Sequence, residues 1–174
     1  EKANHVLTAG DTVYIRQGIY HSYFAPENSG TDSYPIVYMN YGTDTVTVSN
    51  TAYGVNLNGR SHIIVRGIQF RYVDRFLWLQ NGANDNRIEY CIFDQGQDID
   101  WSGARIYNNS SFNWIHHCQF SNYGYYNADD IGAILDIGSE ESKTDFSNFN
   151  LLEDNIFFHG GHHILGVFSM YNVI

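Results

Sequence analysis

The feature that most constrains this chain is an internal repeat with a period in the low twenties. Each copy ends in phenylalanine and carries an aliphatic anchor five residues earlier: IIVRGIQF ending at Phe70, NRIEYCIF ending at Phe93, NWIHHCQF ending at Phe120, and NLLEDNIF ending at Phe157. The anchors fall at positions 65, 88, 115 and 152, and the pattern begins once more at position 174. Self-similarity at such a period is typical of a solenoid.

A second short segment recurs within each copy of the repeat. Residues 77–81 match 104–108, 135–139 and 165–169, and residues 55–59 fit as an earlier copy. The first and third residues are apolar and the fifth is Asn, Ser or Gly, which indicates a strand with alternating faces followed by a turn. Two or three short strands in a repeat of this length predict one coil of a parallel β-helix, whose coils stack about 4.8 Å apart. A leucine-rich repeat or a propeller blade fits the spacing less well.

Four segments resemble the right-handed parallel β-helix proteins of the pectate-lyase-like superfamily. They are AGDTVYIRQGIY at 9–20, PIVYMNYG at 35–42, SHIIVRGIQF at 61–70 and GGHHILGVFSMYNVI at 160–174. The resemblance implies an all-β, right-handed parallel β-helix solenoid of about five to six coils, as one domain over residues 1–174. Residues 1–8 would be the remnant of an N-terminal cap, residues 139–150 a polar insertion loop, and the chain is expected to be truncated within a coil at Ile174.

The same resemblance implies a carbohydrate-active protein that is secreted or displayed at the cell surface. The superfamily includes polysaccharide lyases, glycoside hydrolases, binding proteins and adhesins, so a polysaccharide is the expected partner. An uncapped coil exposes strand edges, which predicts end-to-end self-association. A non-catalytic carbohydrate-binding or adhesive module, or an inactive fragment, is the alternative from a different functional class.

Charge narrows the range of ligands. Nine Lys and Arg residues against 19 Asp and Glu residues give a formal net charge of -10. Nucleic-acid binding through phosphate neutralisation is therefore not expected, and neither is binding to an anionic membrane. No apolar run approaches the roughly 18 residues of a membrane span. An anionic polysaccharide would be repelled unless a divalent cation such as Ca²⁺ bridges it, so Ca²⁺ is a candidate cofactor.

Two repeat positions predict structural roles. Asn86, Asn113, Asn150 and Asn172 occupy one position, and their amides can donate to one neighbouring coil while accepting from the other, which predicts a buried ladder. Cys91 and Cys118 share another position and are expected to be buried reduced thiols.

Two rows of residues are predicted to point outward. The first is Arg66, Glu89, His116 and Glu153, interpreted as an exposed ion-pair ladder that serves solubility and register. The second is Trp78, Arg105, Asp136 and Gly166. Here an aromatic ring could stack on a pyranose while the charges bind hydroxyls or a uronate. The competing interpretation pairs Arg105 with Asp136 and covers Trp78 with a loop.

The segments that connect each Phe to the next inward aliphatic vary most in length, and insertions in a solenoid gather on its working face. Candidate catalytic residues are Asp129, Asp130, His162, Arg105 and Asp136, candidate substrate-binding residues are Trp78, Trp101, Tyr125 and Tyr126, and candidate metal ligands are Asp98 and Asp100. Asp129-Asp130 and Gly161-His162-His163 resemble the DD and GHG elements of polygalacturonase-type hydrolases, although the third residue is His rather than Gly.

Two chemistries remain open for this set of residues. Paired carboxylates can act as general acid and base at a glycosidic bond. Alternatively, bound Ca²⁺ can neutralise a uronate and acidify its C5 proton, which a base then removes in a β-elimination. For the second chemistry, Arg105 is the best-placed outward base, and Lys143 is the only lysine beyond the N-terminus.

Overall fold

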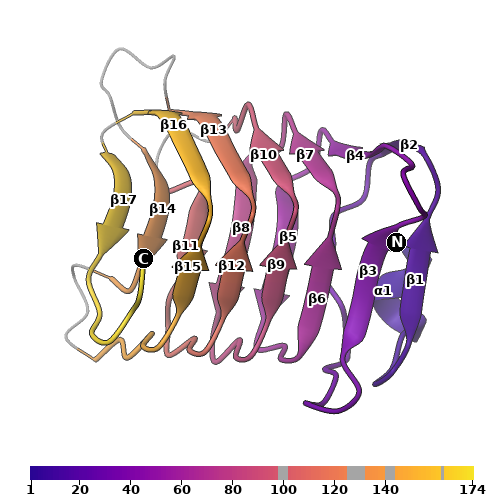
Figure 1. Ribbon diagram of the computed structural model, residues 1–174, viewed down its shortest axis with the longest axis horizontal. Helices are drawn as coiled ribbons and strands as arrows, with labels where there is room; N and C mark the ends of the chain where they lie inside the picture. Colours follow the sequence, from indigo (N-terminus) through magenta and orange to yellow (C-terminus); the bar gives the residue numbers. More distant parts are fainter. Residues whose placement is uncertain (98–101, 125–131, 140–143, 162) are drawn as a thin grey trace.

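The computed structural model describes residues 1–97, 102–124, 132–139, 144–161 and 163–174. Within these ranges the chain forms three parallel sheets that wrap around a common core, with the short helix α1 (Lys2–Val6) at the N-terminal end (Figure 1). The predicted right-handed parallel β-helix is confirmed. Among the described residues two sheets have six strands and the third has five, in agreement with the expected number of coils.

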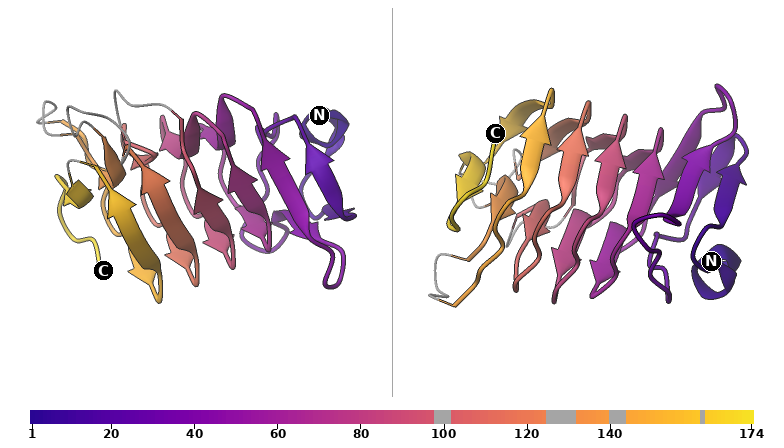
Figure 2. Two further views of the ribbon diagram at one scale, coloured as in Figure 1. Left: turned by 90° about the horizontal axis from the view of Figure 1, so that it is seen from above. Right: turned by 60° about the horizontal axis from the view of Figure 1, so that its bottom comes forward.

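Each sheet collects one strand from each successive coil, except that the first coil, with β1 and β2, adds none to sheet C (Figure 2). Sheet A consists of β1 (Thr12–Ile15), β3 (Ile36–Asn40), β6 (Ile63–Arg66), β9 (Arg87–Glu89), β12 (Trp114–His116) and β15 (Leu151–Glu153). Sheet B consists of β2 (Gly18–Tyr20), β4 (Val46–Ser49), β7 (Gln69–Arg71), β10 (Ile92–Asp94), β13 (Gln119–Tyr123) and β16 (Ile156–Gly160). Sheet C consists of β5 (Tyr53–Asn58), β8 (Arg75–Gln80), β11 (Ala104–Ile106), β14 (Ala133–Ile137) and β17 (His163–Val167).

The strand register follows the sequence repeat. Phe93 is opposite Phe70 on one side and Phe120 on the other. The rings of the four repeat phenylalanines stack nearly parallel, with centroid separations of 4.8, 4.6 and 5.1 Å along the series. This spacing matches the distance between coils, so each aromatic ring packs against its own counterpart and excludes water from the core.

Sheets A and B are joined by tight turns whose backbone is left-handed. Gly67, Tyr90, His117 and Asp154 have φ angles of 71°, 54°, 52° and 51°. The turns also stack, because the Tyr90 amide donates to the His116 carbonyl at 3.2 Å and the His117 amide to the Glu153 carbonyl at 3.1 Å. These four turns, from β6 onward, have the same length, whereas the earlier connection between β3 and β4, residues 41–45, is longer.

The asparagine ladder satisfies the buried backbone where each coil enters sheet A. The side-chain amides of Asn86, Asn113 and Asn150 each donate to the carboxamide oxygen of the next asparagine, at 3.0, 3.0 and 3.1 Å. The same oxygens accept backbone amides, as when Asn86 N–H donates to Asn113 Oδ1 at 3.1 Å. The prediction of a structural ladder is confirmed, with Asn86 and Asn113 each 1% exposed.

The two cysteines are also neighbours inside the turn region, as predicted. Both are buried and unbridged, and the Cys91 amide lies 3.4 Å from Cys118 Sγ. Burial raises the pKa of the Cys118 thiol far above its ordinary value, and the hydrogen bond and electrostatic interaction with Cys91 act in the same direction. No helix in the described part of the chain is long and apolar enough to cross a membrane.

Candidate active site

The connections from sheet B to sheet C vary in length and border one edge of sheet C, whereas the insertion at 139–150 lies between β14 and β15, in a connection from sheet C to sheet A (Figure 1). Most of the predicted loop residues lie outside the described residues: Asp98, Asp100, Trp101, Tyr125, Tyr126, Asp129, Asp130 and His162. Within the described ranges, no three His, Cys, Asp or Glu side chains gather closely enough to hold a metal ion. The described part of the site is therefore the outer face of sheet C.

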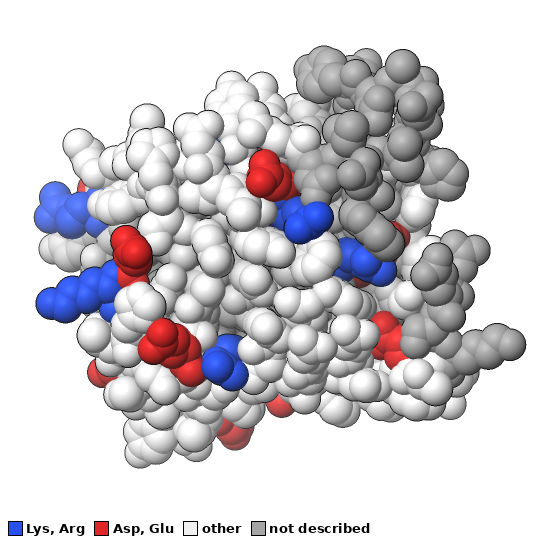
Figure 3. Space-filling view, turned by 180° about the vertical axis from the view of Figure 1, so that it is seen from behind, with Lys and Arg blue, Asp and Glu red and all other residues white. Residues whose placement is uncertain are grey.

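The outward row predicted for this face lies side by side in the structure. Arg105 is opposite Trp78 and Asp136, and Asp136 is in turn opposite Gly166. Figure 3 views the molecule from behind Figure 1, on the side of sheet C, and shows basic and acidic side chains adjacent to one another between wide uncharged areas. Stacking of coils therefore brings an aromatic ring, a guanidinium and a carboxylate onto one line.

Trp78 is half-buried within an aromatic band that crosses sheet C. Its ring centroid lies 5.7 Å from that of Tyr53 and 5.4 Å from that of Tyr107, both edge to face. The guanidinium carbon of Arg75 lies 4.7 Å from the Trp78 ring centroid. These contacts fix the plane of the indole without burying it, as a stacking platform for a sugar requires.

Asp136 forms the most enclosed polar group of the site. Its residue exposure is 8%. One carboxylate oxygen accepts a hydrogen bond from the Ser102 hydroxyl, and the other lies 2.8 Å from Nε2 of His163. A carboxylate that holds one ring nitrogen of a histidine fixes the orientation and the tautomer of that ring.

Gly166 is required beside this pair because of space. A Cβ added at Gly166 would lie 2.4 Å from Asp136 Oδ1 and 2.8 Å from His163 Nε2. Because Gly166 has no side chain, the Asp136 and His163 side chains can occupy the space above it.

Arg105 lies in β11, opposite Asp136, and Tyr107 follows the end of that strand. The guanidinium carbon of Arg105 lies 4.7 Å from the Tyr107 ring centroid and 6.0 Å from that of Trp78. The Tyr107 hydroxyl donates to Gln80 Oε1. Burial raises the pKa of Tyr107, and the positive charge of Arg105 offsets part of that rise. The phenol therefore keeps its proton at neutral pH.

The contribution of His163 could not be derived from the pattern alone. Strict alternation along β17 assigns His163 to the inward set with Leu165, because its register partner is Ala133. The structure instead places its Nε2 against Asp136, at the start of the strand. The Gly161-His162-His163 segment was the only sequence signal for it. Ser102, Tyr107 and Arg75 were also missed, because their roles depend on contacts between coils.

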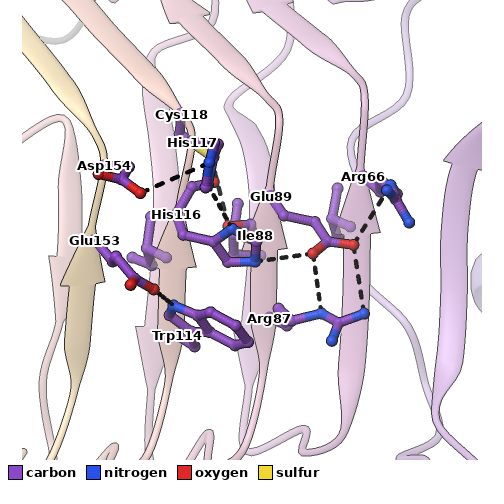
Figure 4. A network of polar contacts seen from close by, with 12 residues as sticks. Arg66, Arg87, Ile88, Glu89, Trp114, His116, His117, Cys118, Glu153 and Asp154 are labelled. Carbon is purple, nitrogen blue, oxygen red and sulfur yellow. Dashed lines mark hydrogen bonds and ion pairs between the residues drawn. The ribbon is translucent and has the colours of Figure 1, made fainter.

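The outward row of sheet A differs from its prediction. Arg66, Glu89 and His116 are adjacent, as expected, and Glu89 lies 3.5 Å from Arg66 and 2.9 Å from His116 (Figure 4). However, Glu89 and His116 are only 4% and 5% exposed, so the expectation of an exposed ladder is wrong for them. The reason is that Arg87, two residues earlier on the same strand, folds over the carboxylate with its Nε at 3.1 Å.

No family model matches the chain. A segment of 47 residues, 27% of this chain, is 43% identical to the uncharacterized protein YwoF of Bacillus subtilis (strain 168), and it spans 10% of that protein.

Three solved structures share the fold. An alginate lyase from Paenibacillus sp. str. FPU-7 superposes with a TM-score of 0.76 and 18% identity over 92% of this chain. A mannuronic acid specific polysaccharide family 6 lyase from human gut microbiota gives 0.62 and 16% over 96%. A PL6 family polysaccharide lyase from Pseudopedobacter saltans gives 0.53 and 18% over 87%.

These likenesses establish the fold. The chain spans 60%, 47% and 44% of the lengths of the three lyases.

Proposed function

We propose that this protein is a polysaccharide lyase that cleaves a uronate-containing polysaccharide on the outer face of sheet C. The observation that carries the proposal is the Asp136–His163 pair, with its 2.8 Å contact, on the face that also presents Arg105 and Trp78. The alginate and mannuronate lyases with the same fold support this choice over a hydrolase. Such a polymer is found outside cells, so we also propose an extracellular location.

The proposed reaction is a β-elimination, in which C5 loses one proton and the leaving oxygen takes one up. A base removes the C5 proton of the uronate, and the electron pair of that C–H bond forms the C4=C5 double bond. The bond between C4 and the glycosidic oxygen breaks, and this oxygen leaves with its electron pair and takes up a proton. The barrier falls when the uronate carboxylate is neutralised, since negative charge develops there as C5 loses its proton.

The described residues can supply each role. His163 can act as the base that accepts the C5 proton, and Asp136, which lies 2.8 Å from its Nε2, then pairs with the imidazolium. A guanidinium stays charged in proteins, so we assign Arg105 to the uronate carboxylate rather than to proton abstraction. Tyr107, beside Arg105, can protonate the leaving oxygen, and Trp78 can support the neighbouring sugar ring.

The proposal includes Ca²⁺ as a second means of neutralising the uronate. Its proposed ligands, Asp98 and Asp100, follow β10 in the connection to sheet C. Oxygen donors of this kind are those that Ca²⁺ prefers. The ion would add positive charge at the uronate carboxylate, in the same sense as Arg105.

The test is a screen of the full chain against polymannuronate, polyguluronate, pectate and a neutral glucan, with and without Ca²⁺. Two signals are followed: ultraviolet absorbance from an unsaturated uronide and the appearance of reducing ends. We expect both signals to rise together on a uronate polymer. Reducing ends without the ultraviolet signal would indicate hydrolysis, and retention on a polysaccharide gel with neither signal would indicate a binding module. Either result would overturn the proposal.

A further inference from the structure

A groove on sheet A, separate from the face of sheet C, has the features of a carbohydrate site. Its volume is about 450 Å³, within the range of small-ligand sites. It is lined by two rows of side chains that run along the axis of the β-helix. Ile64, Arg87 and Trp114 come from the outer face of sheet A, and His62, Asp85 and Phe112 come from the turns that enter it.

The N-terminal wall of the groove is a rigid hairpin, formed by the segment from Thr31 to Pro35. Thr31 and Tyr34 exchange backbone hydrogen bonds at 3.0 Å in both directions. Gly30 anchors the hairpin through its amide, which donates to the Ser61 carbonyl at 3.0 Å. A Cβ at Gly30 would lie 2.5 Å from the His62 carbonyl oxygen, so the hairpin rests directly on the next coil. A wall held in this way is present before any ligand binds.

Phe112 supplies an aromatic surface whose orientation is set by the repeat. One face of its ring stacks on Phe149, with centroids 5.2 Å apart and an angle of 9°. Asn86 and Asn113 are neighbours in the ladder, so the residues that precede them, Asp85 and Phe112, occupy the same position in successive coils. The preceding coil therefore has an aspartate at this position and not an aromatic residue. Among the described residues no ring stacks on the other face of Phe112, and the side chain, 56% exposed, lines the groove.

The floor of the groove is fixed by the buried network of sheet A. Glu89 holds Arg87 through contacts of 3.1 and 3.4 Å, and the indole N–H of Trp114 donates to Glu153 at 3.1 Å. The Trp114 ring also stacks on His116 at 4.1 Å. Figure 4 shows the indole of Trp114 lying between Glu153 and Arg87. A buried carboxylate with several cationic partners adds little net stability, whereas it does orient the side chains that cover it.

The charges of the groove select the ligand. Asp32 and Asp85 line it, and neither makes an ion pair within the described ranges. The guanidinium of Arg87 is already compensated by Glu89. A uronate would therefore meet uncompensated negative charge, whereas the hydroxyls of a neutral sugar can donate to the two carboxylates.

We propose that this groove is a non-catalytic binding site for a neutral glycan, with a pyranose ring stacked on the free face of Phe112. The proposal differs from the function assigned to sheet C in both place and ligand. The molecule would then bind a neutral glycan on one side and act on an anionic polymer on the other.

The experiment titrates the full chain with cellohexaose, mannohexaose and a hexamer of mannuronate, and follows binding by calorimetry. We expect at least one neutral hexamer to bind and Phe112→Ala to weaken its affinity about tenfold, the upper end of what an aromatic contact contributes. Tyr171→Ala is the matched control, because Tyr171 ends the same exposed stack, 5.3 Å beyond Phe149, and does not line the groove.

Three results would overturn the proposal. One is that neither neutral hexamer binds. The second is that Phe112→Ala and Tyr171→Ala weaken binding equally. The third is that Phe112→Ala weakens binding of the mannuronate hexamer more than that of the neutral sugars. Each readout is binding rather than turnover, so a failure here leaves the lyase proposal standing, and the reverse also holds.

Discussion

The outer faces of sheets A and C come from the same coils and yet have different characters. On sheet A the charged side chains contact one another, and Glu89 is surrounded by Arg66, Arg87 and His116. On sheet C the row runs from an aromatic ring through a cation to a carboxylate, and its carboxylate holds a histidine.

The connecting segments explain this difference. From β6 onward, sheets A and B are joined by turns of constant length, whereas the distance from the repeat phenylalanine to the next inward aliphatic of sheet C is 7, 11, 15 and 8 residues. Constant turns let identical positions contact one another coil after coil, which favours a closed network. Variable connections bring new groups to each coil, which favours a reactive face. The loop lengths thus predict where chemistry can occur better than the charges do.

The largest effect is expected from Asp136→Asn on sheet C. Loss of the negative charge removes the group that fixes the tautomer of His163, so turnover of a uronate polymer should fall at least about 100-fold. The matched control is Asp94→Asn on sheet B, because the Asp94 and Asp136 side chains are 13% and 12% exposed. The turnover of the two variants is compared by initial rates, measured from ultraviolet absorbance. Equal losses in the two variants would mean that burial, not the histidine pair, matters.

Glu89→Gln tests the opposite character of sheet A. Two arginines would lose their common counter-charge, and we expect a stability loss of about 2 kcal/mol, less than for a fully buried pair because both arginines are more than a third exposed. Urea unfolding followed by circular dichroism measures it, with Glu153→Gln as a control on the same face. Turnover of the folded enzyme should be unchanged. A Glu89→Gln variant that is stable but inactive would contradict the division between the faces.

Gly166→Ala should reduce activity while the fold persists. The added methyl group would displace Asp136 and His163, and we expect a roughly tenfold lower kcat, since a small displacement of a base is costly. Gly82→Ala is the control, because a Cβ there meets nothing within 4 Å. Gly82 has a positive φ of 75°, so Gly82→Ala is expected to lose some stability but no turnover of the folded enzyme. A fully active Gly166→Ala variant would remove the Asp136–His163 pair from the mechanism.

The smallest effect concerns the buried thiols in the turns between sheets A and B. The pKa of Cys118 is raised in the folded state, so its contribution to stability is complete below the ordinary thiol pKa of about 8.5 and is lost as the pH rises above it. The expected loss is about 1 kcal/mol by one pH unit above that value. Urea midpoints at pH 7.5 and 9.5 measure it, and Cys118→Ala should lack this slope. Rapid reaction of native Cys118 with a thiol reagent at pH 8.5 would contradict the burial of this thiol.

The sequence was sufficient for the parts of the molecule that repeat. The phenylalanine stack, the asparagine ladder and the outward rows all follow from spacing, because stacking converts a sequence period into a spatial contact. It was insufficient where a contact departs from alternation, as with His163, or where a side chain folds over its neighbour, as Arg87 does over Glu89. Those outcomes depend on rotamers and on packing between coils, which a pattern does not encode.

The most direct test of two chemically different faces uses the indole N–H signals in a ¹H–¹⁵N NMR spectrum. The chain has three tryptophans, and Trp78 lies on sheet C while Trp114 lies on sheet A. Trp78→Phe and Trp114→Phe variants assign the two signals. On addition of oligomannuronate, we expect the Trp78 signal to shift and the Trp114 signal to stay in place. A shift of the Trp114 signal with no change at Trp78 would contradict the assignment of the uronate site to sheet C.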